Sequence, residues 1–520
     1  MPKMNRRNFI RTVIVGGAGI TAMGLPFERV YSQSPRRQSA VRTNHRHVVR
    51  EPAHMLRDGH QFLLPSPTEY RDVVVVGAGA NGLVAAYHLP DIELVCLEKE
   101  PRCGGNAQRS KWRGIEFTEG TAYTSVRSKL VDFMHSEFDI APTPIQSNVG
   151  YIVGKKVIPD FYQTGFDELP FDEATRAEFY RFRDACDDAA SRLRSGLASL
   201  YSGEPISNRL LRDEVTKLEK MSFEQWLKNN NYPREVVEWC DAYCPTDSSG
   251  YPRNMSAIIG LVSMANLGNY DGSATFPGGL APMAEALAAG IRTQGANRIR
   301  TGTFVVSVAN TPDGKNVNVT YLQANKLHTI RCKACIWGAP KHIAAYVVKD
   351  MPKEQKAAIG NMSYNDISVM NLCYDRRIYD GALITWMNDA PINNILSADW
   401  VINAGNTDPD SPQVLTCDWT NRPEHRALLL DDDWIVEQCQ ESARRLEEIF
   451  PGSIDHLVEI RLPLRAHSWV SSSPGYVTEL LPVISNDVGR VVITRSDQGS
   501  FGQAYAAGLE NAVRVRDWLN

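Results

Sequence analysis

The fold of this chain is decided by the stretch Asp72-Val73-Val74-Val75-Val76-Gly77-Ala78-Gly79-Ala80-Asn81-Gly82. Its β-branched first half is typical of a strand buried on both faces of a parallel sheet. The glycines follow at once, and Leu83 to Leu89 continue at helical spacing. Gly77 permits a tight turn, Gly79 lets the backbone approach a pyrophosphate, and Gly82 lets the helix pack closely on the strand. The N-terminus of the helix then faces the phosphates.

An acidic residue completes this pattern. The apolar run Ile92 to Leu97 predicts a second strand, and Glu98 ends that strand 21 residues after Gly77. A carboxylate at this place accepts hydrogen bonds from the ribose hydroxyls of an adenine dinucleotide and repels a 2′-phosphate. Strand, glycine loop, helix, second strand and acid together predict a Rossmann-type dinucleotide-binding domain. These residues alone leave NAD and FAD open.

The residues after Glu98 favour FAD. The run Glu98-Lys99-Glu100-Pro101-Arg102-Cys103-Gly104-Gly105-Asn106-Ala107 resembles the second glycine motif of the FAD-dependent amine oxidase superfamily. Glu119 to Ala122, Phe276 to Leu280, Arg298 to Val308 and Gly489 to Gly508 resemble later elements of the same family, in the same order. Motif and resemblance together imply these FAD-binding residues: Gly77, Gly79, Gly82, Glu98, Arg102, Gly104, Gly105, Asn106, Val305 and Asp497.

The departures from the family pattern are informative. Asn106 stands where many amine oxidases have arginine, and Ser496-Asp497-Gln498 replaces the commoner Ala-Gly-Glu. Both departures resemble the bacterial spermidine dehydrogenase-like branch. Covalent members of the family attach the flavin to a cysteine just before the terminal helix, and no cysteine follows Cys439. We therefore expect non-covalent FAD.

The family-like segments are separated along the chain, which predicts an α/β fold with an insertion. We expect a Rossmann-type FAD-binding domain of the amine oxidase and glutathione reductase kind, with an inserted α+β substrate domain. The FAD-binding domain takes residues 68–145, 271–345 and 456–520, and the substrate domain takes 146–270 and 346–455. Residues 1–50 are expected to be a signal and linker.

Oxidation by a bound flavin requires few acid–base groups from the protein, because the cofactor carries the difficult step. Aromatic side chains near the flavin would exclude water and attract an ammonium group through their faces. The candidate catalytic residues flank the terminal motifs, and each of them also fits an ordinary core position: Trp469, Tyr476, Tyr505 and His467. The lysine that the family places near the flavin has no counterpart, because Met362 to Tyr374 contains none.

The first residues have the layout of an export signal. Asn5-Arg6-Arg7-Asn8-Phe9-Ile10-Arg11 resembles the twin-arginine motif, and a modest apolar run follows from Val13 to Phe27. Val13 to Ile20 imitates a glycine loop, but no second strand or acid follows it. The segment predicts export in the folded state to the periplasm or the medium.

The charged-residue and cysteine content of the chain limits the kinds of partner that it can bind. Residues 51–520 hold 46 Lys or Arg against 59 Asp or Glu, whereas residues 1–50 hold ten against one. An acidic body argues against nucleic-acid binding, and no later stretch is apolar enough to span a membrane. Cys332 and Cys335 supply two ligands where zinc needs three or four, so we expect buried thiols and no metal.

Three functions remain open at this stage. The first is oxidation of an amine, such as a polyamine, to an imine, with oxygen, a quinone or a cytochrome as electron acceptor. The second is desaturation or isomerisation of an isoprenoid, since carotenoid enzymes share the same flavin motifs. The third is a flavin-binding accessory protein without turnover, which the missing lysine favours.

Overall fold

The computed structural model describes residues 41–47, 51–145, 149–248, 250–267, 272–388, 390–399, 401, 408–495 and 500–520. The predicted twin-arginine segment and Asp497 lie outside these residues. From Thr43 onward the chain forms one unit.

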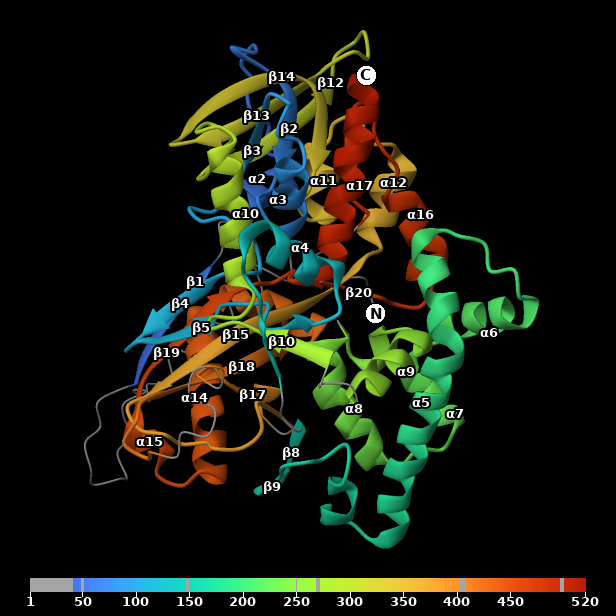
Figure 1. Ribbon diagram of the computed structural model, residues 1–520, viewed down its shortest axis with the longest axis vertical. Helices are drawn as coiled ribbons and strands as arrows, with labels where there is room; N and C mark the ends of the chain where they lie inside the picture. The colour runs from blue at the N-terminus through green and yellow to red at the C-terminus, as the bar shows by residue number, and fades with distance from the viewer. Residues whose placement is uncertain are drawn as a thin grey trace, which may run out of the picture. The chain divides into compact units, whose positions relative to one another are not determined.

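A seven-stranded sheet carries the glycine-rich stretch (Figure 1). Parallel pairing joins β11, β3, β2, β14 and β21, and antiparallel pairing adds β13 and β12 beyond β14. The strands are β11 (Ile299–Arg300), β3 (Leu94–Leu97), β2 (Glu69–Val76), β14 (Lys326–Trp337), β13 (Val317–Gln323), β12 (Phe304–Asn310) and β21 (Val491–Ile493).

Helices cover both faces of this sheet because β2 is apolar on both. Val73 and Val75 pack with α3 (Ala80–Tyr87), α10 (Ala281–Thr293) and α17 (Phe501–Leu519), and α3 lies between the other two in Figure 1. Val74 and Val76 face the opposite cluster, which includes residues of α2 (Glu51–Arg57) and α11 (Lys341–Val347). The predicted doubly covered parallel strand is confirmed.

The C-terminal helix α17 holds α3 in place through close contacts. A Cβ on Gly508 would lie 2.7 Å from the carbonyl oxygen of Asn81 in α3. The Asn81 amide donates a 2.8 Å hydrogen bond to Thr494 Oγ1, at the end of β21, and Asn511 of α17 donates to Asn81 Oδ1. The first helix of the glycine motif is therefore fixed by the end of the chain.

A second sheet has nine strands, six of which lie in the segments predicted to contact substrate. Its order is β1-β19-β15-β18-β17-β16-β8-β9, and β20 also pairs with β15. These strands are β1 (Arg42–His47), β19 (Leu457–Leu464), β15 (Ser363–Tyr374), β18 (Gln413–Asn421), β17 (Asn394–Ser397), β16 (Ile384–Met387), β8 (Val149–Val153), β9 (Lys156–Ile158) and β20 (Trp469–Ser471).

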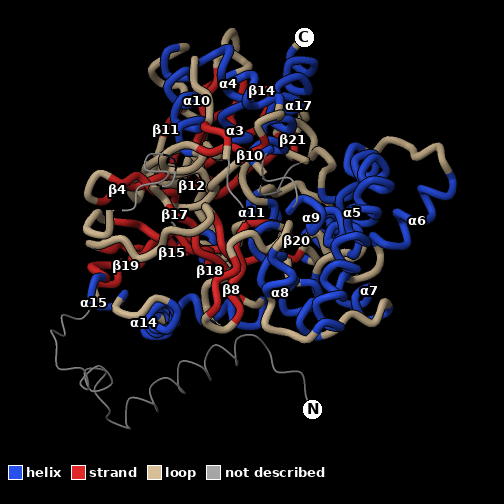
Figure 2. The backbone as a smooth tube through the Cα atoms, turned by 60° about the horizontal axis from the view of Figure 1, so that its bottom comes forward, coloured by secondary structure: helices blue, strands red, loops and turns tan. Residues whose placement is uncertain are grey.

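Helices surround this second sheet. Trp434 of α14 (Asp432–Ile449) packs on Trp419 of β18. Helices α5, α6, α7, α8 and α9 gather to one side (Figure 2), around a core rich in aromatic rings such as Phe179, Phe182 and Trp239. Their bounds are α5 (Glu173–Ser202), α6 (Arg209–Glu219), α7 (Phe223–Asn229), α8 (Arg234–Asp247) and α9 (Ala257–Ala265). The predicted α/β fold with a mixed second part is confirmed.

The sheets divide the chain differently from the predicted domain boundaries at three strands. Strands β19 and β20 fall in the segment 456–520 assigned to the FAD-binding domain, yet both pair with β15 of the second sheet. Strand β1 falls in the predicted linker and lies at the edge of the same sheet. Strand β1 contains no apolar residue that would predict a strand, and the apolar residues of β19 and β20 do not tell which sheet these strands join.

Two further features bear on the predictions. Cys332 and Cys335 are buried free thiols in β14, as expected. Among the described residues, no helix is both long and apolar enough to cross a membrane.

Candidate functional site

The first glycine loop leads into an open helix N-terminus. Gly77 has φ +94°, and a Cβ on Gly82 would lie 1.9 Å from the Gly77 carbonyl oxygen. Helix α3 begins after Gly79, whose backbone is extended and which offers no side-chain cap. The first N–H groups of a helix lack partners within the helix and favour negative charge. They are therefore placed to hold a diphosphate.

The second glycine loop lies directly against the first. The N–H of Gly104 donates to the Ala78 carbonyl at 2.8 Å, and Gly104 forms a bridge with Gly79. A Cβ on Gly105 would lie 3.1 Å from the Cα of Gly79. The five glycines predicted from the sequence thus meet as one cradle of bare backbone, which fits the diphosphate of FAD.

Glu98 lies at the end of β3, beside this cradle. Its carboxylate is buried and accepts from the N–H groups of Ala78 at 2.7 Å and Glu100 at 2.8 Å. Burial raises the pKa of Glu98, and the two backbone hydrogen bonds oppose that shift. Carboxylate oxygens have further lone pairs, so Glu98 is positioned to accept from a ribose.

Val305 approaches Glu98 through its strand rather than through its side chain. Thr303 donates to the Glu98 carbonyl through its N–H at 2.8 Å, two residues before Val305. The side chain of Val305 is buried in the core beneath β2. Any contact of Val305 with the adenine therefore uses its backbone.

The close contacts between glycines and neighbouring backbone continue beyond the cradle. A Cβ on Gly120 would lie 2.1 Å from the Asn106 carbonyl oxygen, and one on Gly279 would lie 2.5 Å from the Thr121 carbonyl oxygen. Both segments, 119–122 and 276–280, were predicted from the family resemblance. Together with the cradle, these two segments form a continuous run of close backbone contacts from α3 towards the second sheet, which we call the glycine path.

Asn106 connects this path to the segment between β19 and β20. Its amide nitrogen donates to the Ser468 carbonyl at 2.9 Å, and its oxygen accepts from Arg465 Nη1 at 3.2 Å. Arg465 is buried, and burial lowers its pKa to about 10, which leaves it cationic at neutral pH. Its Nη2 is also buried and has no hydrogen-bond partner among the described residues. A buried, unsatisfied donor beside the glycine path fits an acceptor atom of the cofactor.

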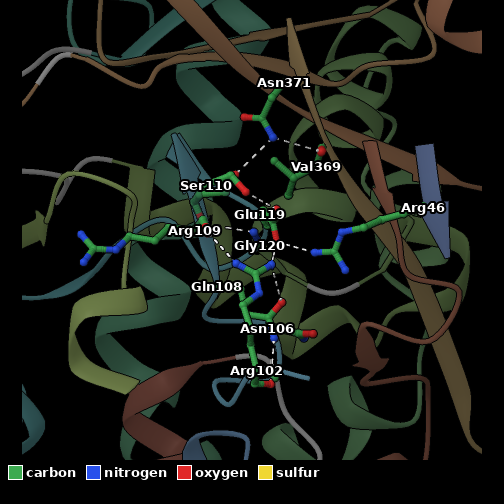
Figure 3. A network of polar contacts seen from close by, with 12 residues as sticks. Arg46, Arg102, Asn106, Gln108, Arg109, Ser110, Glu119, Gly120, Val369 and Asn371 are labelled. Atoms are coloured by element: carbon green, nitrogen blue, oxygen red, sulfur yellow. Dashed lines mark hydrogen bonds and ion pairs between the residues drawn. The ribbon is translucent and has the colours of Figure 1, made fainter. Parts of the chain in front are cut away.

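Arg102 lies in a network of polar contacts around Glu119 (Figure 3). Its guanidinium donates to Glu119 at 2.7 Å and to the Arg109 carbonyl at 2.9 Å. Arg46 of β1 donates to the same Glu119 carboxylate at 2.6 Å. In the described structure Arg102 holds the loop around the cradle together. A direct contact with FAD stays a prediction.

The four predicted catalytic residues do not lie together, and only His467 and Trp469 share a segment. His467 and Trp469 follow Arg465, and Trp469 pairs with Asn365 of β15. The ring of His467 stacks on His342 with centroids 4.3 Å apart. Desolvation by the surrounding protein lowers the pKa of His467, and the positive charge of Arg426 adds to the shift, so the imidazole is neutral at working pH.

Tyr476 and Tyr505 do not lie with that pair. Tyr476 is fully buried in the core that contains Val74 and Val76. Tyr505 packs on Phe133 at 5.2 Å, on the helical layer over the opposite face of the sheet. Their positions are those of core aromatic residues, the alternative that the sequence left open for each.

A pocket opens where the glycine path meets the second sheet. Its interior volume is about 20 Å³, which is room for about one water molecule. Most of the lining is apolar or aromatic, with a few hydroxyl groups. The lining residues are Phe117, Thr118, Ala122, Tyr123, Thr275, Phe276, Gly278, Gly279, Leu383, Leu396, Ser397, Ala398, Val401 and Thr416.

Two carboxylates lie beside this pocket. Tyr123 of the lining donates to Asp247 at 2.6 Å, and Tyr243 donates to the other oxygen of Asp247. Asp418 lies two residues from the pocket-lining Thr416 on β18, so both point to the same face of the sheet. The Asn394 amide donates to Asp418 at 2.7 Å.

These carboxylates share one electrostatic environment. Burial raises the pKa of Asp418 to about 6, the hydrogen bond from Asn394 opposes this, and the charge of Asp247 adds to it. Asp247 is the last residue of α8, where the helix dipole adds negative potential. The aromatic ring of Trp386 packs on Tyr243 with centroids 5.1 Å apart. Asp247, Asp418 and Arg465 were not predicted from the sequence, because no local motif marks them.

Comparison with known proteins agrees with this geometry. A family model described as flavin-containing amine oxidoreductase matches residues 81–515. The chain belongs to this family. Its cofactor is accordingly FAD, and the glycine cradle, Glu98 and Arg465 are the residues that would hold it.

Relatives of this amine oxidoreductase are distant in sequence. A probable flavin-containing monoamine oxidase A of Dictyostelium discoideum is 23% identical over 216 residues, which cover 40% of this chain and 43% of that protein. The match thus spans less than half of that relative's length.

Two solved structures share the fold. A triple mutant of putrescine oxidase superposes with a TM-score of 0.68 at 17% identity, covering 87% of this chain and 100% of that one. Cyclohexylamine oxidase from Brevibacterium oxydans IH-35A gives a TM-score of 0.66 at 15% identity, covering 86% and 99%.

Replacing Glu98 tests the FAD site. Glu98→Ala removes an acceptor for the ribose, and loss of a hydrogen bond to a charged group costs about 1.5–3 kcal/mol, or roughly 10–100-fold in affinity. We expect the purified variant to have lost most of its flavin, measured as the ratio of visible to ultraviolet absorbance after gel filtration. Heat denaturation of wild type should release the flavin into solution if attachment is non-covalent.

Glu93→Gln is the matched control, since Glu93 is exposed and pairs with Arg71 on the same segment. It should keep its full complement of flavin. A folded Glu98→Ala protein that is fully loaded with FAD would remove Glu98 from the site.

Proposed function

We propose that this protein oxidises a small amine to an imine, and that its preferred substrates are diamines or polyamines. Bound FAD supplies the redox chemistry, because it accepts a hydride equivalent from the carbon beside the amine nitrogen. The protein must position that carbon and exclude water, and the apolar pocket beside the glycine path is suited to both tasks.

The observation that carries the polyamine proposal is the pair Asp247 and Asp418 beside the pocket. A diamine has a second ammonium group some carbons away from the one that reacts. Two carboxylates at the edge of an apolar pocket would bind that group while the alkyl chain lies against the lining. Tyr243, which donates to Asp247, and Trp386, which packs on Tyr243, are buried aromatic residues beside the acids.

The distribution of charged residues around the site supports a diamine or polyamine substrate. Near the glycine path lie Arg465, which is cationic, and His467, which is neutral. Asp247 and Asp418 supply negative charge beside the pocket, next to the lining residues Tyr123 and Thr416. A diamine would therefore place its ammonium end among the carboxylates and its neutral amine end towards the glycine path. The reacting amine must be uncharged, and this orientation keeps it away from the two carboxylates.

An anaerobic reduction experiment tests the proposed activity. The flavoprotein is purified with its native FAD, freed of oxygen and mixed with a panel of amines that includes spermidine, putrescine and butylamine. We expect polyamines or diamines to bleach the visible absorbance of the flavin, and butylamine to bleach it more slowly. Re-admitted oxygen restores the colour rapidly in an oxidase and slowly in a dehydrogenase that uses a quinone or cytochrome. A yellow protein that no amine bleaches contradicts the proposal.

Substitution of the acids tests how the second ammonium is bound. Asp418→Asn removes a charge without changing shape, and we expect kcat/KM for putrescine to fall about 10–100-fold, while butylamine changes by less than about twofold. Asp410→Asn, on the exposed loop before β18, is the control and should change neither.

The same carboxylate predicts a pH dependence. Because the pKa of Asp418 is raised to about 6, the group loses its charge as the pH falls through that value. The ratio of kcat/KM for putrescine to that for butylamine should therefore fall between pH 7 and pH 5 in wild type. The ratio should be flat in Asp418→Asn. A ratio that is independent of pH in wild type would show that Asp418 does not bind the substrate.

We also propose that the protein is exported in its folded, FAD-loaded form by the twin-arginine route, on the strength of residues 5–11. A double substitution, Arg6→Lys with Arg7→Lys, should retain flavin-loaded protein inside the cell, as measured by fractionation and immunoblotting. Arg11→Lys should be exported normally. Unchanged export of the double variant would contradict this route.

A further inference from the structure

Strand β1 carries two histidines on one face. Side chains alternate along a strand, so His45 and His47 point the same way. Both are half-buried, whereas Asn44 and Arg46 are exposed on the other side. Those two are engaged elsewhere, because Asn44 donates to Glu459 at 3.0 Å and Arg46 donates to Glu119 at 2.6 Å.

An aspartate from a distant helix lies opposite these histidines. Asp432 is the first residue of α14, and Asp431 caps that helix by accepting from the N–H groups of Asp433 and Trp434. The cap fixes the first turn and so the place of Asp432. Its Oδ1 lies 3.0 Å from His45 Nε2 and 3.5 Å from His47 Nε2.

The three side chains have the spacing of metal ligands. One ligand atom from each lies within 4.8 Å of the others. In a tetrahedral zinc site with bonds of about 2.0–2.1 Å, ligand atoms are about 3.4 Å apart. The two measured distances fall on either side of that value. The third pair, between the two histidines, lies within 4.8 Å.

We propose that His45, His47 and Asp432 bind a divalent transition-metal ion, with zinc the best match. Imidazole nitrogens and a carboxylate oxygen are a ligand set that zinc accepts. The Asp432 side chain is 70% exposed, so water can complete the fourth position and the ion can enter from solvent.

A metal at this place would join two elements that are far apart in the sequence. Strand β1 is an edge strand, and its pairing with β19 leaves its other edge open. The ion would tie one face of β1 to α14, while Arg46 ties the other face to Glu119 and Arg102 (Figure 3). The role of the ion is therefore structural, since it secures the beginning of the folded unit to the finished sheet.

Zinc titration of untagged flavoprotein tests the site. The protein is treated with chelator, desalted and titrated with Zn²⁺, and the bound metal is counted by mass spectrometry after gel filtration. We expect one zinc per chain, slower hydrogen exchange in residues 42–47, and a Tm higher by about 2–5 °C at saturating zinc. Each of His45→Gln, His47→Gln and Asp432→Asn should weaken binding by at least about 10–100-fold, the loss that even an outer partner of a metal ligand causes.

His135→Gln is the control, because His135 is exposed on α4 (Lys129–Phe138). It should bind zinc as wild type does. Flavin content, measured on every variant, separates loss of the metal from loss of the fold. The proposal is overturned if flavin-loaded wild type takes up no zinc, or if the three variants bind zinc as tightly as the control; the cluster is then an ion pair only.

Discussion

The close approach of two backbone loops at Gly79 and Gly105 is the constraint on which the rest of the site depends. No side chain fits between them, since a Cβ on Gly105 would lie 3.1 Å from the Cα of Gly79. This contact sets the N-terminus of α3 beside the second loop, which presents its N–H groups to a diphosphate. It also fixes Asn106, and through Asn106 the buried Arg465 and the segment that leads to β20.

The proposed substrate side of the site is assembled in a different way. The glycine path comes from consecutive loops, whereas Asp247 ends a helix and Asp418 lies on a strand more than 150 residues later. The pairing of β17 with β18 and the packing of α8 on the sheet bring the two carboxylates close enough for the charge of Asp247 to act on Asp418. A family with one flavin chemistry can thus change substrates by altering these separate elements and leaving the cradle intact.

The parts that the sequence predicts are those that depend on near neighbours. The strand β2, its glycine loop, α3, β3 and Glu98 lie within 30 residues, and each follows from local sterics. Arg465, Asp247 and Asp418 escaped prediction because their partners lie far away along the chain. The same limit applies to β19, whose apolar residues do not tell which sheet it joins, and β1 contains no apolar residue that would predict a strand at all. Tyr505 shows the converse case, in which an aromatic residue near a predicted cofactor motif packs in a core.

The contacts by which α17 fixes α3 have a consequence for the order of folding. The helix that begins the cradle, at residue 80, is secured by Thr494, Gly508 and Asn511. Contacts so distant in sequence form only after the intervening loop has been closed. During synthesis the cradle therefore remains incomplete until residues 494–511 have left the ribosome. Cofactor capture consequently requires these residues, and a ribosome that stops before them releases a polypeptide without a completed FAD site.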